Sequence, residues 1–446
     1  MKNIDVLNLE WTSFSSRDRE AATLVCNYLR HQGLSVYEGS IFNGFYLLKK
    51  YRPKILFITN TTGAFINQQV TRFAKKLKIP VITTISEGNL KEGYVQEMVW
   101  GHNKERISFE DKYLVWSSRS KKLILNHNKK LSNIVNISGS AGHDKYFILK
   151  NLLSKNKNKN KNRVCIGIGC WGFDYYMQTP KENDLIPQSD KDFFMKERDG
   201  FNEILSNIIK NNQDCKFIFK EHPGNLLGHV GSGIESCINF PNVEVYDNDK
   251  TIFDCILESD LWITYDSTTA MEAWLLDKQT CILNPSKSKW PHMRDQMHLS
   301  QPILNSVKDL QEAIDSIKSR DIISGFNDFK NIRKKVIKQV IEWNDGLNHV
   351  RVGNEIIEFI SKKSKISSID SRLALPSTKN VISQRLKWII FQYSPFLPKP
   401  TKNEKSRLKW NKNELKAFSS KRMKQQSYFY DLFKLDREKL LKIRAQ

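Results

Sequence analysis

The sequence has no long apolar run. Nowhere in its 446 residues does an apolar segment approach the ~20 residues that a membrane-spanning helix requires. Its first residues also lack a basic stretch followed by an apolar one, which is the layout of a secretion signal. We therefore expect a cytoplasmic protein, at most peripheral at the inner face of the cytoplasmic membrane.

Cysteine is scarce, and metal-binding spacings are missing. The seven cysteines are odd in number and scattered through apolar runs, which indicates buried reduced thiols and no disulfide framework. The acidic run at residues 247–249 lies between a predicted strand and a predicted helix, where a turn and a cap are expected. His292 and His298 lack zinc-site spacing, and Arg294 beside them could contact an acceptor or a phosphate. We expect no metal and no cofactor.

The net charge of +23 is concentrated at the end of the chain. Residues 361–446 carry 22 lysines and arginines against 6 acidic residues, a net +16, so the body is nearly balanced. Within this tail, residues 388–397 form an apolar-aromatic stretch suited to a membrane interface. Such a tail predicts adhesion to an anionic membrane; the alternative is a helix packed on the body with a solvated extension. Nucleic-acid binding is disfavoured, because basic and aromatic residues are not interleaved in the body.

Alternating strand and helix patterns predict the fold. At 39% hydrophobic residues, the chain is long enough for two domains, each with an apolar core. Residues 1–150 repeat a strand-helix alternation, as a parallel, doubly wound α/β sheet requires. Residues 151–163 are lysine- and asparagine-rich and predict a linker or loop. A second α/β series spans 164–325, followed by C-terminal helices at 326–360 and the tail. We expect two Rossmann-like domains facing a cleft.

The first candidate site motif directly follows the predicted strand at residues 216–219. A histidine placed there stands at the carboxyl edge of a parallel sheet, where ligands bind in open α/β folds. It could donate a hydrogen bond to a phosphate or ribose oxygen, although a solvated surface turn explains it equally well. The motif is Lys220-Glu221-His222-Pro223-Gly224.

A second motif, Asp266-Ser267-Thr268, leads from a strand into a helix predicted at residues 268–277. Hydroxyls beside free backbone N–H groups at a helix start can cradle a phosphate. Glu272 is one turn after Thr268 and is predicted on the same helix face, away from the apolar residues. Helix capping is the alternative for these residue types.

A glycine-rich segment at residues 167–172 matches a dinucleotide-binding fingerprint, but the residues after it do not open a helix cleanly. We interpret it as a strand followed by a cleft loop. Gly169 and Trp171 are its candidate ligand-facing residues.

Together, the histidine-proline turn and the hydroxyl pair before a Glu-Ala helix resemble the donor half of GT-B glycosyltransferases of bacterial surface carbohydrates. The similar groups are sialyltransferases, Kdo transferases and CDP-glycerol polyol-phosphate transferases. The resemblance covers about residues 1–320 and implies that His222, Ser267 and Thr268 hold the nucleotide of a CMP- or CDP-linked donor. Here the pair is Ser-Thr and not Ser-Ser, which leaves the donor class open.

In the sialyltransferase-like families, an acidic pair before glycine supplies the general base. This chain has Ser86-Glu87-Gly88 with a single acid, so the resemblance implies that Glu87 takes the proton of the acceptor hydroxyl. The implied activity is an inverting, metal-independent sugar transfer, with a CMP-linked donor favoured, to a surface polysaccharide or lipid-linked glycan. The alternatives are a polyol-phosphate transferase and a nucleic-acid-binding protein without enzymatic activity.

Overall fold

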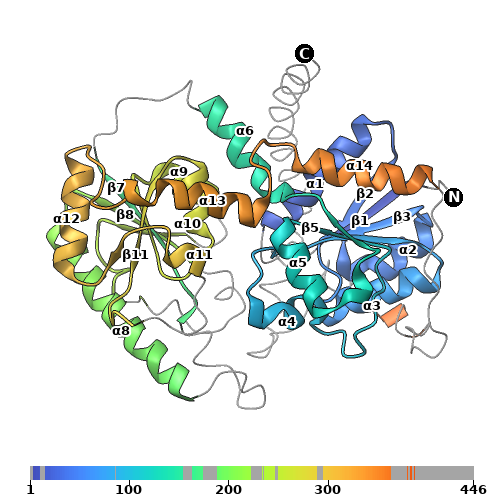
Figure 1. Cartoon of the computed structure of the whole chain (residues 1–446), viewed down its shortest axis with the longest axis horizontal. Coiled ribbons are helices and arrows are strands. Elements are labelled where there is room, and N and C mark those ends of the chain that lie inside the picture. The colour runs from blue at the N-terminus through green and yellow to red at the C-terminus, as the bar shows by residue number, and fades with distance from the viewer. Residues whose placement is uncertain are drawn as a thin grey trace. The chain divides into compact units, whose positions relative to one another are not determined.

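The computed structural model contains two compact α/β units (Figure 1). It describes residues 4–10, 16–85, 87–153, 163–173, 188–221, 234, 236–246, 250–288 and 295–362, and positions 379, 382, 383 and 386. The first unit comprises the described residues up to Leu149 and those from Lys338 onward, and the second unit comprises those of Lys150–Ile337.

The first unit is built on a parallel six-stranded sheet with the order β2-β1-β3-β4-β5-β6. Its elements are β1 (Val6–Glu10), α1 (Ser16–His31), β2 (Val36–Ser40), α2 (Gly44–Tyr51), β3 (Ile55–Ile58), α3 (Phe65–Lys76), β4 (Val81–Thr84), α4 (Val95–Trp100), β5 (Lys112–Val115), α5 (Ser118–His127), β6 (Val135–Ile137), α6 (Asp144–Leu153) and the returning helix α14 (Asn348–Ser361).

The two faces of this sheet carry separate apolar clusters. Leu7 and Leu9 of β1 face the cluster under α2 and α3, whereas Val6 faces the one under α1 and α14. Because successive side chains of a strand point to opposite faces, a strand covered on both sides is apolar throughout. Strand β3, Ile-Leu-Phe-Ile, is buried at every position for this reason.

The second unit has its own parallel sheet, with the order β12-β11-β10-β7-β8-β9. Its elements are β7 (Cys165–Gly169), α8 (Gln188–Asn211), β8 (Lys216–Lys220), β9 (Val243–Tyr246), α9 (Ile252–Glu258), β10 (Leu261–Thr264), α10 (Thr269–Leu275), β11 (Gln279–Leu283), α11 (Asp295–His298), β12 (Ile303–Leu304), α12 (Val307–Lys318) and α13 (Lys330–Ile341), whose last residues enter the first unit.

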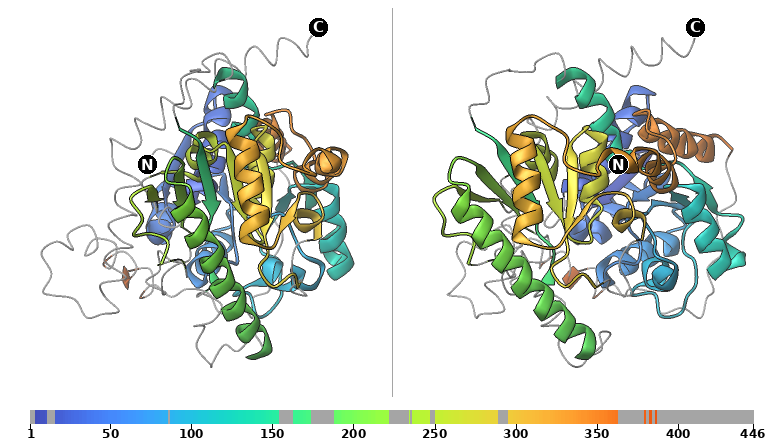
Figure 2. Two further views of the ribbon diagram at one scale, coloured as in Figure 1. Left: turned by 90° about the vertical axis from the view of Figure 1, so that its left-hand side faces the viewer. Right: turned by 60° about the vertical axis from the view of Figure 1, so that its left-hand side comes forward.

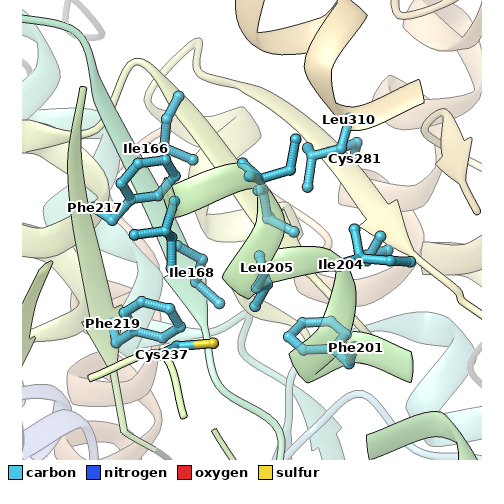
Figure 3. Packing of buried hydrophobic residues seen from close by; sticks show 14 of the residues in the cluster. Ile166, Ile168, Phe201, Ile204, Leu205, Phe217, Phe219, Cys237, Cys281 and Leu310 are labelled. Atoms are coloured by element: carbon cyan, nitrogen blue, oxygen red, sulfur yellow. The ribbon is translucent and has the colours of Figure 1, made fainter. Parts of the chain in front are cut away.

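Helices cover both faces of the second sheet. Helices α8 and α12 contact each other on one face, and α9 and α10 contact each other (Figure 2). The core under α8 includes side chains from β7, β8 and α8 (Figure 3): Ile166, Ile168, Phe217, Phe219, Phe201, Ile204 and Leu205. The prediction of two parallel, doubly wound α/β sheets is confirmed.

The chain returns to the first unit through α14. Asp144, at the start of α6, accepts hydrogen bonds from the backbone N–H (2.7 Å) and the ring Nδ1 (2.9 Å) of His349, and from the Asn348 side chain (2.9 Å). Both His349 and Asp144 are buried. The start of α14 is therefore tied to residues about 200 positions earlier, a contact that the sequence pattern does not reveal.

Candidate functional site

The sheet of the second unit changes direction between β7 and β10. From β7 the chain builds outward to β8 and β9, and then returns to the other side of β7 to add β10, β11 and β12. At such a point the loops leaving the two strands diverge to opposite faces of the sheet and open a crevice at the carboxyl ends. The loops after Gly169 and Thr264 are therefore where this unit is expected to bind a ligand.

The first predicted donor motif begins beside this point. Lys220 is the last residue of β8, which pairs with β7. Burial raises the pKa of the Cys170 thiol, and the positive charge of Lys220 opposes this rise. The Glu221 backbone N–H bonds the Tyr246 carbonyl (2.9 Å), so the chain stays paired one residue further. His222, Pro223 and Gly224 lie outside the described residues. Because β8 and β10 flank β7, the strands that lead into the two motifs lie roughly 10 Å apart, at about 4.8 Å per strand.

The second predicted donor motif forms the turn between β10 and α10. Asp266 is buried, whereas Ser267 and Thr268 are partly exposed. The Ser267 hydroxyl accepts hydrogen bonds from the backbone N–H (3.2 Å) and the hydroxyl (3.0 Å) of Thr269. The Ser267 hydroxyl thus satisfies the first backbone N–H of the helix, although the N-cap residue itself is Thr268, whose side chain makes no cap hydrogen bond. Contact of Ser267 or Thr268 with a ligand stays a prediction.

Helix α10 differs from the expected one in length and exposure. It has seven residues and is shorter than the helix predicted at residues 268–277. Because the dipole of a helix sums over its peptide units, a phosphate here would be bound by the hydroxyl groups more than by the helix dipole. Glu272 is 4% exposed and is buried together with the apolar residues of the helix. Six of the seven residues of α10 are buried, so burial does not set the predicted Thr268–Glu272 face apart from the apolar one. The predicted role of Glu272 in binding stays a prediction.

An aromatic cluster joins the two loops at the direction change. The Trp171 ring lies 5.2 Å from the Tyr265 ring and 5.0 Å from the Phe173 ring, and all three side chains are buried. Burial, and then the neighbouring Glu197 carboxylate, raises the pKa of the Tyr265 hydroxyl. Trp171 is thus a packing residue that fixes its loop against the Asp266 turn, and its predicted contact with a ligand is untested.

The glycines of β7 make room for a tryptophan. A Cβ at Gly167 would lie 2.4 Å from the Trp262 ring, and one at Gly169 would lie 3.1 Å from it. The Trp262 Nε1–H donates to the Thr269 hydroxyl (3.1 Å). Gly169 is the last residue of β7, and its small size admits the side chains of Trp262 and Thr269.

The predicted general base lies in the first unit, on a firmly held turn after β4. Glu87 is exposed, and the next residue, Gly88, packs so closely on Trp116 that a Cβ would lie 2.1 Å from the ring. The Gly88 carbonyl accepts a hydrogen bond from Ser120 (2.7 Å). The position of Glu87 is therefore set by the backbone of its neighbour.

A small cavity of about 20 Å³, partly open to solvent, lies at the same carboxyl edge of the first sheet. It is lined by Asp18, Ala21, Val25, Phe57, Thr59, Thr84, Ile85, Trp116, Gly139, Ser140, Ala141 and Gly142. Since Trp116 also contacts Gly88, Glu87 lies on the segment that borders the cavity. No sequence motif singles out four of these lining residues, although each follows a strand or lies near a helix start: Asp18, Thr59, Trp116 and Ser140.

Behind this cavity lies a buried carboxyl group. Glu10, the last residue of β1, accepts hydrogen bonds from the Asn8 side chain (2.8 Å) and from the Thr59 backbone N–H (2.9 Å). The Thr59 hydroxyl also contacts it. Burial raises the pKa of Glu10 to about 8, and the charge of Asp18 adds to the rise. Two carboxyl groups in unlike environments thus lie near one another.

Within the described ranges, no group of three or more His, Cys, Asp or Glu side chains is placed to hold a metal ion. His298 is buried at the end of α11, whereas residues 247–249, His292 and Arg294 lie outside the described residues. No helix in the described part of the chain is long and apolar enough to span a membrane.

No family model and no curated protein matches the sequence. Among solved structures, MnaA of S. aureus, solved with UDP, has a TM-score of 0.52 and 13% identity over 83% of this chain and 100% of that one. The UDP-GlcNAc 2-epimerase of Neisseria meningitidis, bound to UDP-GlcNAc, has a TM-score of 0.50 and 12% identity over 80% and 100%. The wall teichoic acid polymerase TagF has a TM-score of 0.50 and 10% identity over 81% and 90%.

At these identities the likeness concerns the fold. The chain therefore has the two-domain GT-B architecture, and the resemblance predicted from its motifs is confirmed at that level. The particular transferase group within that architecture stays a prediction.

Proposed function

We propose that this protein transfers a sugar from a nucleotide-activated donor, with a CMP-linked donor favoured, to a hydroxyl of a surface polysaccharide or lipid-linked glycan. The observation that carries the proposal is the change of direction in the second sheet. Lys220, Trp171 and the Asp266 turn come from the ends of three neighbouring strands, at the carboxyl edge where open α/β sheets bind their ligands.

In this proposal the second unit binds the donor. Lys220 supplies positive charge toward the nucleotide phosphate, and His222 donates a hydrogen bond to it. The hydroxyls of Ser267 and Thr268 bond the phosphate oxygens, while Glu272 and Asp266 accept hydrogen bonds from the nucleoside. A buried acceptor such as Glu272 suits a ribose hydroxyl, because a buried carboxylate gains from each donor that reaches it.

The first unit supplies the general base. The Glu87 carboxylate takes the proton of the acceptor hydroxyl as that oxygen attacks the anomeric carbon. The bond from this carbon to the nucleotide's phosphate oxygen breaks, and its electron pair leaves with the nucleotide. Attack from the face opposite the leaving group inverts the anomeric centre. The protonated Glu87 then returns its proton to water.

The test begins with nucleotide binding. Thermal unfolding is measured with CMP, CDP, UDP and GDP, because a ligand at about 100 times its Kd stabilises the folded protein by about 2.7 kcal/mol. Turnover is then assayed with the matching nucleotide sugar. Mass spectrometry and NMR of the products separate sugar transfer from transfer of a phosphorylated polyol and from epimerisation of the donor.

Variants test the site assignment. His222→Ala is expected to lower kcat by about 10²–10⁴-fold, the usual contribution of a positioned proton donor. Ser267→Ala is expected to weaken nucleotide binding by about 10- to 100-fold, since a hydrogen bond to a charged group contributes about 1.5–3 kcal/mol. The matched controls are the exposed residues His102 and Ser288, each changed to Ala. If His222→Ala and Ser267→Ala both retain wild-type donor binding and transfer, the assignment is wrong.

A further inference from the structure

One face of helix α13 is made of lysines. Lys330, Lys334 and Lys338 are four residues apart and therefore lie on one face of the helix, and Lys335 is beside them. All four side chains are exposed. Because the helix contains no acidic residue, no charge within it offsets these ammonium groups. The exposed face of α13 is therefore basic.

The opposite side of α13 holds the helix on the second unit. The Arg333 guanidinium lies 3.7 Å from the centre of the Phe326 ring and donates hydrogen bonds to the carbonyl groups of Phe326 (2.6 Å) and Ser300 (3.4 Å). Arg333 and Val336 are buried. The lysines thus stand on a helix whose other side is anchored, so the packing of α13 fixes the direction in which they point.

Exposed aliphatic side chains border this helix. Leu299 is 57% exposed and Ile332 is 43% exposed. They directly precede Ser300 and Arg333, so the hydrogen bond between those two residues brings Leu299 and Ile332 to the same part of the surface. Ile322, 53% exposed, is in the segment between α12 and α13. Apolar groups that gather on a surface mark a contact site for a protein or a membrane.

The lysines decide between these two kinds of partner. Interfaces between proteins are depleted of lysine, whereas lysines beside exposed apolar side chains are typical of helices that lie at an anionic bilayer. A long lysine side chain can follow an apolar surface while its ammonium group stays among the headgroups, and each such charge strengthens binding to anionic lipid. The surface around α13 therefore fits a membrane better than a protein.

We propose that this surface, formed by Lys330, Lys334, Lys335, Leu299 and Ile332, is a contact site for a bilayer of anionic phospholipids. The ammonium groups bind the headgroup phosphates, while Leu299 and Ile332 contact the boundary of the acyl chains. The site is separate from the basic tail, and it does not depend on the proposed sugar transfer. Two contacts carried by one chain bind a membrane more tightly than either contact alone, because the second forms without a new encounter from solution.

A fluorescent probe tests the site on the full-length protein. The seven cysteines are all buried, so a single new surface cysteine can be labelled selectively. Ile332→Cys is labelled with the environment-sensitive dye NBD and mixed with vesicles of phosphatidylcholine containing about 30% phosphatidylglycerol. We expect a blue shift and at least about a twofold gain in emission, because the dye enters the bilayer interface. Met195→Cys on α8, 40% exposed, is the matched control and should not respond.

Neutralising the lysines tests the role of charge. Co-sedimentation with the same vesicles compares the wild type with the triple variant Lys330→Gln, Lys334→Gln, Lys335→Gln. Its binding is expected to fall about 100-fold, at about fivefold for each lysine near an anionic surface. A control that removes the same charge from exposed lysines of the first unit should change binding by less than about twofold. This control is the triple variant Lys122→Gln, Lys129→Gln, Lys130→Gln.

Three results would each overturn the proposal: no response of the probe at position 332, the same response at position 195, or an equal loss of binding in the two lysine variants. Binding that is lost with Trp388→Ser and Phe391→Ser in the tail, but kept in the α13 lysine variant, would assign the membrane contact to the tail alone and reject the α13 site. A wild type that does not bind anionic vesicles also rejects it, whatever its transfer activity.

Discussion

At the scale of single residues, the first unit keeps a carboxyl group where water does not reach it. Glu10 is 4% exposed at the end of β1, and burial raises its pKa to about 8 from an ordinary value near 4.5. Its partners, Asn8 and Thr59, connect β1 to β3 at the carboxyl edge. Glu10 is thus a positioning group for the Thr59 side of the cavity, at a cost in stability when it ionises.

The pH dependence of stability follows from the sign of this shift. A raised pKa means that the folded protein binds the proton more tightly than the unfolded chain, so this group makes the wild type less stable as the pH rises from about 4.5 to 8. Glu10→Gln removes this effect, so at pH 9 the variant should unfold at a higher urea concentration than the wild type. The gain in its free energy of unfolding is at most about 5 kcal/mol, at 1.36 kcal/mol per pKa unit. Below pH 4 this contribution disappears.

Urea unfolding of both proteins at pH 4, 7 and 9, followed by a probe in the first unit such as Trp116 fluorescence, measures the difference. Glu97→Gln, at an exposed carboxylate, serves as the control. Parallel pH profiles of the wild type and Glu10→Gln would show that Glu10 does not titrate in this way.

At the scale of secondary-structure elements, the glycines of β7 match a dinucleotide-binding fingerprint but make room for the packing of a neighbouring strand. Its alternate residues Ile166 and Ile168 face α8, while Gly167 and Gly169 face the opposite side, where Trp262 of β10 lies across them. The glycines that resemble a nucleotide fingerprint here accommodate a neighbouring strand's side chain. The aromatic residue that needs the space is 95 positions later in the chain, so local spacing does not reveal the reason.

Gly167→Ala tests this packing. Its Cβ would lie 2.1 Å from the Ser259 Oγ and 2.4 Å from the Trp262 ring, and both side chains are fully buried. We expect a loss of about 1–3 kcal/mol, typical of overpacking in a close-packed core. Gly93→Ala is the matched control, because a Cβ there meets nothing within 4 Å. The measurement is thermal unfolding, and equal melting temperatures for the two variants would contradict the assignment.

Some elements were predictable and others were not. The strand predicted at residues 216–219 is present as β8, which runs one residue further because Lys220 still pairs with Gly169 and Tyr246. The sequence pattern missed β2, an edge strand with the sequence Val-Tyr-Glu-Gly-Ser, since an edge strand need not be apolar on both faces. The apolar spacing also predicts a helix over residues 201–211, and α8 ends at Asn211 but begins already at Gln188. The prediction started late because the first turns of α8 are rich in charged residues.

At the scale of the whole molecule, the chain divides its charge unevenly. The tail, residues 361–446, carries a net +16, and nearly all of it lies outside the described residues. Its amphipathic stretch was expected either to contact an anionic membrane or to pack on the body. Because the proposed acceptors include lipid-linked glycans, membrane contact would bring the enzyme to its substrate, and we keep this as a proposal.

Vesicle co-sedimentation of the full-length protein tests the tail. Binding is expected to vesicles containing 30% phosphatidylglycerol but not to phosphatidylcholine alone, with about 1 kcal/mol contributed by each basic residue near the surface. Binding should fall at least tenfold between about 50 and 500 mM salt, because screening shortens the range of the attraction. The double variant Trp388→Ser, Phe391→Ser should bind the vesicles more weakly. Trp343→Ser, in the segment between α13 and α14, is the control and should bind like the wild type. Salt-independent binding or equal binding to neutral vesicles would reject the electrostatic model.

The sequence by itself determined the class of fold and the positions of most strands, because apolar periodicity and turn residues act over a few neighbouring positions. It also predicted that the two candidate donor motifs follow strands, as Lys220 at the end of β8 and Asp266 after β10 do. The tertiary structure alone decided the strand order, and with it the direction change between β7 and β10 that places Lys220 and the Asp266 turn at one edge. It alone brought Asp18, Thr59 and Trp116 into one cavity. The physical reason is that alternation fixes which face a side chain takes, whereas the choice of neighbouring strand depends on contacts between residues far apart in the chain.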